Sequence, residues 1–115
     1  MEDLLIETLE RFGYPVIRQG SLSETDPYPD QFFTFWNNDS DGEFYNNTES
    51  FVIWDYDLNF YSIDPAKTYS VIEETVKLLR GVGFIIGGRG YDVPSDEITH
   101  TGRGINLLYR EAIEP

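Results

Sequence analysis

The chain contains no cysteine among its 115 residues. Disulfide bonds, thiol catalysis and zinc sites built from thiolates are therefore excluded. No apolar run approaches the roughly 18 residues of a membrane-spanning helix. The first residues, Met1 to Ile6, lack the basic and apolar regions of a secretory signal. We therefore expect a soluble protein that is made in a cytoplasm.

Basic residues are also scarce, and none occurs between Arg18 and Lys67. The formal net charge is −13 and the pI is near 4.1. Binding nucleic acid through its phosphates, or binding an anionic membrane surface, requires clustered lysine and arginine. Eight scattered basic residues do not form such a cluster in the sequence. We expect neither a DNA-gripping protein nor a membrane-binding one.

The segment without basic residues is rich in both acids and aromatics. It holds both tryptophans and most of the phenylalanines. Its ten acids are Glu24, Asp26, Asp30, Asp39, Asp41, Glu43, Glu49, Asp55, Asp57 and Asp64. An acidic segment with few aromatics would be typical of a disordered tail. This composition instead predicts a folded sheet with a negative outer surface, to which we assign Asp39, Asp41, Glu43, Asp55 and Asp57.

Length and patterning predict one domain, residues 1–115, with no linker and no repeat. The predicted elements are a helix over 2–12, strands over 16–18, 31–36 and about 44–61, a helix from 64–65 to 81 or 83, and strands over 84–86 and 105–109. Residues 91–103 are expected to be irregular or extended. The predicted fold class is α+β, an antiparallel sheet with two helices packed on one face, in the order α-β-β-β-α-β-β.

The clearest pattern in the sequence is the alternation from Val52 to Phe60. Apolar residues occupy the even positions, and the odd positions end in Asp55, Asp57 and Asn59. Since successive side chains of a strand point to opposite faces, this segment predicts a half-buried strand with a carboxylate face.

The second helix has a start signal and an apolar stripe. Asp64 is a good N-cap residue, and Pro65 suits the first helical position. The expected buried stripe consists of Tyr69, Ile72, Val76 and Leu79. In the first helix the expected buried residues are Leu5, Leu9 and Phe12, and Gly13 is the expected C′ residue.

Two motifs suggest ligand sites and match them poorly. Asn37–Gly42 has the acids and the glycine of a calcium loop, but Thr48 occupies the position that requires a bidentate glutamate. The glycine-rich run 81–88 follows a helix and opens a strand, the reverse of a dinucleotide-binding loop. We predict an acidic hairpin loop and a helix C-cap followed by a turn, with no metal site and no cofactor site.

Catalytic alternatives rest on Asp55, Asp57 and His100. Two carboxylates that share a strand face suit glycosidic acid–base chemistry only if a pocket raises the pKa of one of them. His100 is the one histidine, and its surroundings, Thr99–Gly104, are typical of a polar loop that leads into a strand. We predict no catalytic residues, although a small hydrolase that uses acids near His100 remains an alternative.

Residues for subunit contact are the remaining candidates. The strand Gln31–Trp36 is apolar on both faces, so it is either buried on both sides or contacts another subunit, for which we name Phe33 and Phe35. Arg89 and Arg103 each precede a glycine and are isolated cations in an acidic chain. Arginine favours bidentate contact with carboxylates, so both are candidates for contact with the acidic sheet of a neighbouring copy. An equally open interpretation is a solvated arginine beside a turn glycine.

Three stretches taken together resemble small structural proteins of long-tailed bacteriophages and prophages of Gram-positive bacteria. They are 31–42 (QFFTFWNNDSDG), 54–65 (WDYDLNFYSIDP), and 90–96 together with 100–104 (GYDVPSD, HTGRG). Within that group the chain is most similar to tail terminator, or tail-completion, proteins of the head–tail junction.

The resemblance implies a small domain with an antiparallel sheet and two packed helices. It implies assembly with copies of itself into a ring, expected to be a hexamer, that caps the tail tube and joins it to the head–tail connector. The implied partners are the major tail tube protein and connector proteins, and the location is the virion, assembled in the host cytoplasm. It implies no enzyme activity and no cofactor, and DNA passes an acidic surface without being gripped.

The charge pattern alone fits a second class of function equally well. An acidic inhibitor or DNA mimic would use the carboxylate face around Asp55, Asp57 and Asn59 to block a basic site on another protein. Such a protein would stay monomeric or dimeric, and its affinity would fall steeply with salt.

Overall fold

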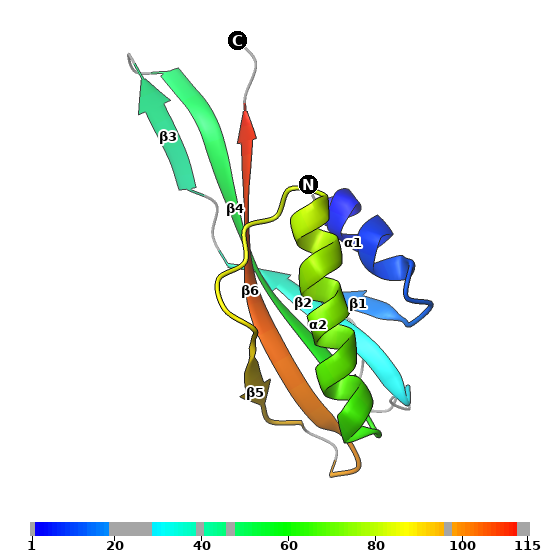
Figure 1. Ribbon diagram of the computed structural model, residues 1–115. Helices are drawn as coiled ribbons and strands as arrows, with labels where there is room; N and C mark the ends of the chain where they lie inside the picture. Colours follow the sequence, from blue (N-terminus) through cyan, green and yellow to red (C-terminus); the bar gives the residue numbers. More distant parts are fainter. Residues whose placement is uncertain (1, 19–28, 39–40, 46–47, 96–97, 113–115) are drawn as a thin grey trace.

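The described part of the computed structural model comprises residues 2–18, 29–38, 41–45, 48–95 and 98–112 (Figure 1). In chain order its elements are α1 (Glu2–Glu10), β1 (Val16–Arg18), β2 (Gln31–Asn37), β3 (Asp41–Tyr45), β4 (Thr48–Ser62), α2 (Pro65–Gly81), β5 (Tyr91–Val93) and β6 (Thr101–Ala112). Both helices lie on the same face of the sheet, so the opposite face is uncovered by any helix of the described chain (Figure 1). The α+β fold class is confirmed.

The sheet is built around the long strand β4. The strand order is β1-β2-β4-β6-β5, and β3 pairs with β4 off this path. One side of β4 pairs first with β3 and then with β2, while its other side pairs with β6 from Phe51 to Ser62. All of these pairs are antiparallel, and only β1 runs parallel to its neighbour β2. The predicted order α-β-β-β-α-β-β holds when the hairpin β3–β4 is counted as the single extended run expected over 44–61.

The register decides which side chains share a face. Phe35, Leu58 and Ile105 lie opposite one another on β2, β4 and β6, on the face that the helices cover. One residue further along β2, the row consists of Trp36, Asp57 and Asn106, which therefore occupies the uncovered face. The predicted alternation in β4 is thus confirmed, with aromatics toward the helices and carboxylates away from them.

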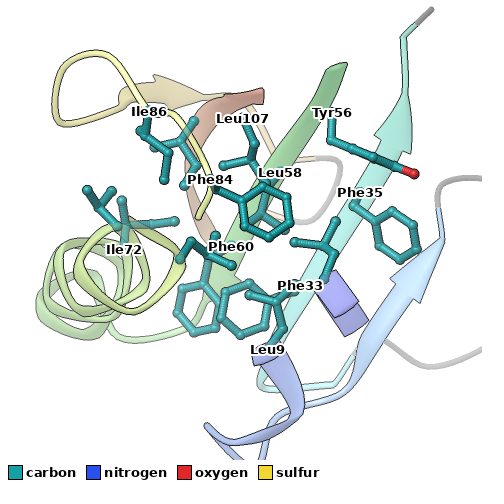
Figure 2. Packing of buried hydrophobic residues seen from close by; sticks show 14 of the residues in the cluster. Leu9, Phe33, Phe35, Tyr56, Leu58, Phe60, Ile72, Phe84, Ile86 and Leu107 are labelled. Carbon is teal, nitrogen blue, oxygen red and sulfur yellow. The ribbon is translucent and has the colours of Figure 1, made fainter. Parts of the chain in front are cut away.

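The core lies between the helices and the sheet (Figure 2). The helices contribute Leu5 and Leu9 from α1 and Ile72 and Leu79 from α2, all fully buried. The buried core residues of β2, β4, β6 and the segment after α2 are Phe33, Phe35, Tyr56, Leu58, Phe60, Phe84, Ile86, Ile105 and Leu107. Because each fully buried large apolar side chain contributes roughly 1.5–3 kcal/mol, this cluster is the main source of stability.

The core placement of Phe33 and Phe35 corrects the prediction that they contact another subunit. Their exposed fractions are 0% and 2%, so neither is available to a partner. The other interpretation of the sequence, burial on both faces of the strand, holds at the start of β2, at Phe32 and Phe33. Phe32 on the other face is also buried, stacked on Tyr61 with a 5.3 Å centroid separation and lying edge-on to His100.

Most of the helix start, end and burial signals in the sequence are confirmed. The Asp64 side chain accepts a hydrogen bond from the backbone N–H of Ala66 at 3.0 Å, which confirms the N-cap. Gly13 follows α1 with a φ of +80°, a conformation that favours glycine. In α2 the stripe is buried except at Tyr69, which is 50% exposed, so that part of the prediction was wrong.

The region after α2 differs most from the prediction. Residues 84–86 form no strand, only a single bridge between Ile85 and Leu108. Gly83 and Gly88 flank this segment with positive φ angles, which turn the backbone away before a ladder can extend. A short strand forms instead at β5, within the region expected to be irregular or extended, and β6 begins at Thr101, four residues before the predicted start.

Candidate interaction surface

The uncovered side of the sheet, which we call the open face, carries a compact polar cluster. Its members are Trp36 and Asn38 at the end of β2, Asp55 and Asp57 on β4, and Asn106 on β6, and we call them the acid–amide network. The antiparallel register brings these three segments together, because Asn38 donates its backbone N–H to Asp55 and Asn106 lies opposite Asp57.

Two asparagine amides hold the two carboxylates from either side. The Asn38 amide donates to Asp55 and to Asp57, both at 3.0 Å. From β6, the Asn106 amide donates to Asp55 at 2.7 Å and to Asp57 at 3.1 Å. Each carboxylate therefore accepts from two amide groups, and the pair is fixed in position although the side chains are only half-buried.

The indole of Trp36 sets the orientation of this cluster. Its Nε1–H can only donate, and it donates to the Asn38 side-chain oxygen at 3.0 Å. The Asn38 NH₂ group must then point toward the two carboxylates. The cluster consequently presents carboxylate oxygens already aligned by donors, and such oxygens form strong charge-assisted hydrogen bonds with cationic side chains.

Next to the network, the edge strand β5 packs closely on β6. A Cβ placed on Gly104 would stand 3.0 Å from Cε2 of Tyr91 and would collide with the side-chain oxygen of Asn59. Asn59 is 6% exposed, so this packing buries it. Burial raises the pKa of the Tyr91 hydroxyl, and the nearby Asp57 carboxylate raises that pKa further.

Apolar side chains surround the polar cluster. Ile85 and Tyr91 are 57% and 47% exposed, and Trp36 and Leu108 are half-buried. The bridge between Ile85 and Leu108 places both beside the row that contains Asp55. Exposed apolar groups around a fixed charged centre are typical of a protein-binding surface.

The catalytic and metal alternatives gain little support from this arrangement. Asp55 and Asp57 share the same two amide donors, so neither stands alone in an apolar pocket of the kind that a general acid requires. Within the described residues, no three histidine, aspartate or glutamate side chains gather as a metal site would need.

The other predicted acidic residues cannot be placed in the same way. In the calcium-like loop, Asn37 ends β2 and Gly42 lies in β3, while Asp39 and Ser40 fall outside the described residues. The backbones of Asp41 and Glu43 belong to β3. Their side chains, like Asp39, lie outside what the structure describes, so the acidic surface is defined here by Asp55 and Asp57.

His100 has a structural environment. Its Nε2 lies 2.8 Å from the backbone oxygen of Pro29, and its Nδ1 lies 3.0 Å from the hydroxyl of Thr99. The ring packs edge-on to Phe32 at 5.9 Å. These contacts link the segment before β2 to the segment before β6, far from Asp55 and Asp57 along the strands.

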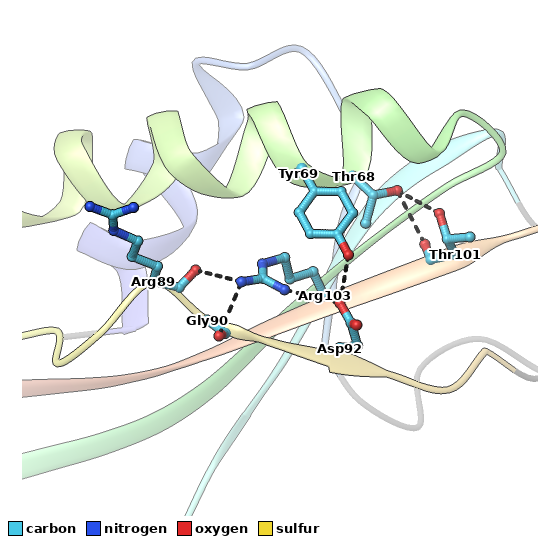
Figure 3. A network of polar contacts seen from close by, with 7 residues as sticks. All are labelled: Thr68, Tyr69, Arg89, Gly90, Asp92, Thr101 and Arg103. Atoms are coloured by element: carbon cyan, nitrogen blue, oxygen red, sulfur yellow. Dashed lines mark hydrogen bonds and ion pairs between the residues drawn. The ribbon is translucent and has the colours of Figure 1, made fainter.

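Arg103 is engaged within its own chain (Figure 3). Its guanidinium forms an ion pair with Asp92 at 2.9 Å and lies 4.8 Å from the ring centroid of Tyr69. It also donates to the backbone oxygens of Arg89 and Gly90, at 3.3 and 3.2 Å. Since its side chain is only 17% exposed, Arg103 is a poor subunit contact, whereas the exposed Arg89 stays a candidate.

The helix side of the molecule carries a groove of about 300 Å³ in which cations gather. Its lining residues are Glu73, Val76, Lys77, Arg80, Gly88 and Arg89, and we call it the cationic groove. Arg80 donates to the backbone oxygen of Ile86 at 2.6 Å, which fixes the loop that carries Arg89. Lys77 and Arg80 are three residues apart on α2, so their proximity could be predicted from the sequence. Arg89 lies in the loop after α2, and only the fold brings it beside them.

No protein-family model matches the chain, and no curated protein matches it significantly. Within the described part of the chain, no helix combines the length and the apolar character that crossing a bilayer requires.

Proposed function

We propose that this protein is a structural subunit of a bacteriophage virion, which assembles with copies of itself into a ring at the end of the tail tube. The ring would cap the tube and join it to the head–tail connector, as the resemblance to tail terminator proteins implies. Its action is physical, by contact with copies of itself and with neighbouring virion proteins, and it uses no cofactor.

The open face is the observation that carries this proposal. One whole side of the sheet lies free of the helices and combines a fixed acidic centre with exposed apolar side chains. A two-layer domain, in which helices cover one face of the sheet and leave the other face bare, has a second surface to bury. This favours an assembly subunit over an enzyme, whose reacting groups would be expected in a concave pocket.

The charge of the chain supports the proposed relation to DNA. With 21 acidic and eight basic residues, most surfaces that a ring could turn toward its channel are negative. Like charge opposes the counterion release that drives DNA binding, so the genome would pass without adhering. Self-repulsion would also weaken the contacts between free subunits, so that they associate only transiently until a tube end supplies a template for a stable ring.

Electron microscopy of the purified protein, alone and mixed with assembled tail tubes, tests the proposal. We expect density at one end of the tube or at the neck, with rotational symmetry. Tubes whose ends carry no added density would refute the role. Tight binding to duplex DNA in a fluorescence titration would contradict the passive acidic channel.

The same preparation separates the alternative function. An acidic inhibitor or DNA mimic would ignore the tubes, stay monomeric or dimeric, and bind a basic protein with an affinity that falls steeply as salt rises.

A further inference from the structure

We propose that the open face of one subunit binds the cationic groove of the next, with Lys77 and Arg89 of one copy contacting Asp55 and Asp57 of its neighbour. This inference rests on the proposed function, since it names the two surfaces that would join subunits in the ring. It commits to one occupant for the open face, a second copy of this chain.

The acid–amide network has the properties of an interface centre rather than of a channel lining. Asp55 and Asp57 accept from Asn38 and Asn106, so part of their hydration is already replaced by fixed donors. A cationic side chain that binds here meets two carboxylates whose positions are already fixed, so binding requires little further ordering of the acidic side chains. Exposed Ile85 and Tyr91 beside the network would exclude water from such a contact. A solvated surface past which DNA slides does not require exposed apolar side chains.

The cationic groove is the complementary surface on the same chain. It gathers three of the eight basic residues of the sequence, Lys77, Arg80 and Arg89. Neither the ion pair of Arg18 with Glu2 nor that of Arg103 with Asp92 involves any of these three. In a chain with a net charge of −13, such a cluster is the surface on which a carboxylate pair is most favoured.

The two surfaces lie on opposite sides of the molecule. The groove belongs to α2 and the loop after it, on the helix-covered side, and the network lies on the bare side of the sheet (Figure 1). Two different surfaces that fit each other give a heterologous, head-to-tail contact, which closes into a ring when its rotation permits. A helix of one copy would then cover the bare sheet of the next.

The absence of cysteine makes a direct test possible. Glu73→Cys marks the groove, and Leu108→Cys marks the open face. Oxidation of an equal mixture should give face–groove dimers in at least about fivefold excess over face–face and groove–groove dimers, because the proposed contact is heterologous. A statistical product ratio, or an excess of either like pair, would overturn the proposal. Ile85→Cys, which is 57% exposed and is bridged to Leu108 on the open face, repeats the test if Leu108→Cys does not fold.

A charge reversal with a matched control tests the named residues. Adding Lys77→Glu and Arg89→Glu to the groove-marked chain should reduce the face–groove product to the statistical level. Adding Arg11→Glu and Lys67→Glu, two exposed cations outside the groove, lowers the net charge equally and should leave the excess intact. Equal loss in both variants would show that overall repulsion, rather than this contact, governs the yield, and would overturn the assignment.

The outcomes also separate this inference from the proposed function. If the wild-type protein caps tail tubes but the cross-linking is statistical, the interface is wrong and the ring role stands. If the face–groove dimer forms but the protein never locates at a tube end, the contact is right and the virion role is wrong.

Discussion

Tyr91 lies over Gly104, so that the edge strand β5 covers a position where β6 has no side chain. The two residues are partners in the antiparallel register, and the tyrosine ring takes the space that a side chain on β6 would fill. Beneath the ring, Asn59 is buried next to the acid–amide network. The position of the Tyr91 ring over β6 therefore depends on the absence of a Cβ at residue 104.

The first prediction concerns this contact. Gly104→Ala should lower the free energy of unfolding by about 1–3 kcal/mol, because the new methyl group would collide with the Asn59 side chain and press on Tyr91. Chemical denaturation monitored by tryptophan fluorescence measures the change. Gly87→Ala is the matched control, since a Cβ there meets nothing within 4 Å, and it should change stability by no more than about 0.5 kcal/mol. Equal effects of the two substitutions would refute the packing argument.

The second prediction concerns the amide that bridges the two carboxylates. Asn38→Asp should destabilise the protein by about 1–2 kcal/mol at neutral pH and low salt, because it replaces two donor contacts at this exposed site by repulsion between carboxylates. The loss should shrink at high salt, which screens the repulsion between the carboxylates. Equilibrium urea denaturation at low and at high salt checks both parts.

A comparison of two variants isolates the charge in that experiment. Asn38→Ala removes the same amide without adding a carboxylate, so its loss of stability should depend less on salt. If both variants lose the same stability at both salt concentrations, the amide does not act by holding the two acids together.

Much of the fold could be predicted because its signals are local. The N-cap at Asp64, the glycine after α1 and the alternation in β4 each depend on a few neighbouring residues, and each was confirmed. The pairing of β5 could not be predicted within the region expected to be irregular or extended, because Tyr91–Val93 is short and pairs with glycines of the separate strand β6. The assignment of Phe33 and Phe35 failed for a related reason: an apolar strand does not reveal which of its faces meets a helix.

Only the two aspartates of the candidate site could be predicted from the sequence. Asp55 and Asp57 were placed on one face by the period of the strand, as the structure confirms. Their partners Asn38 and Asn106 lie 17 to 51 residues away from Asp55, and only the register of three strands brings them together. The role of Arg103 was misjudged because Asp92 and Tyr69, which hold it, belong to β5 and α2.

The third prediction concerns Arg103. Arg103→Lys should destabilise the protein by about 1–2 kcal/mol, because a lysine cannot bind Asp92, stack on Tyr69 and donate to the two backbone oxygens at once. Thermal unfolding followed by circular dichroism measures the loss. Arg89→Lys keeps the charge at an exposed position and should be close to neutral. A neutral Arg103→Lys would show that charge alone, without the planar guanidinium, maintains the junction of α2, β5 and β6.

The fourth prediction follows from the buried hydroxyl of Tyr56. Burial raises the pKa of this group, the Glu2 carboxylate raises that pKa further, and Arg18 lowers it in part. An unfolded tyrosine ionises near pH 10, whereas the folded protein keeps the Tyr56 proton to a higher pH. Above about pH 10 the native state therefore binds more protons than the unfolded state, and the free energy of unfolding falls as pH rises, by at most about 1.4 kcal/mol per pH unit for one group.

Tyr56→Phe removes the group and should flatten the alkaline fall in the free energy of unfolding, measured by denaturation curves from pH 8 to pH 11. Tyr91→Phe should give a second, independent decrease in that slope. An unchanged slope in Tyr56→Phe would mean that the hydroxyl beside Glu2 and Arg18 ionises as freely in the folded protein as in the unfolded chain.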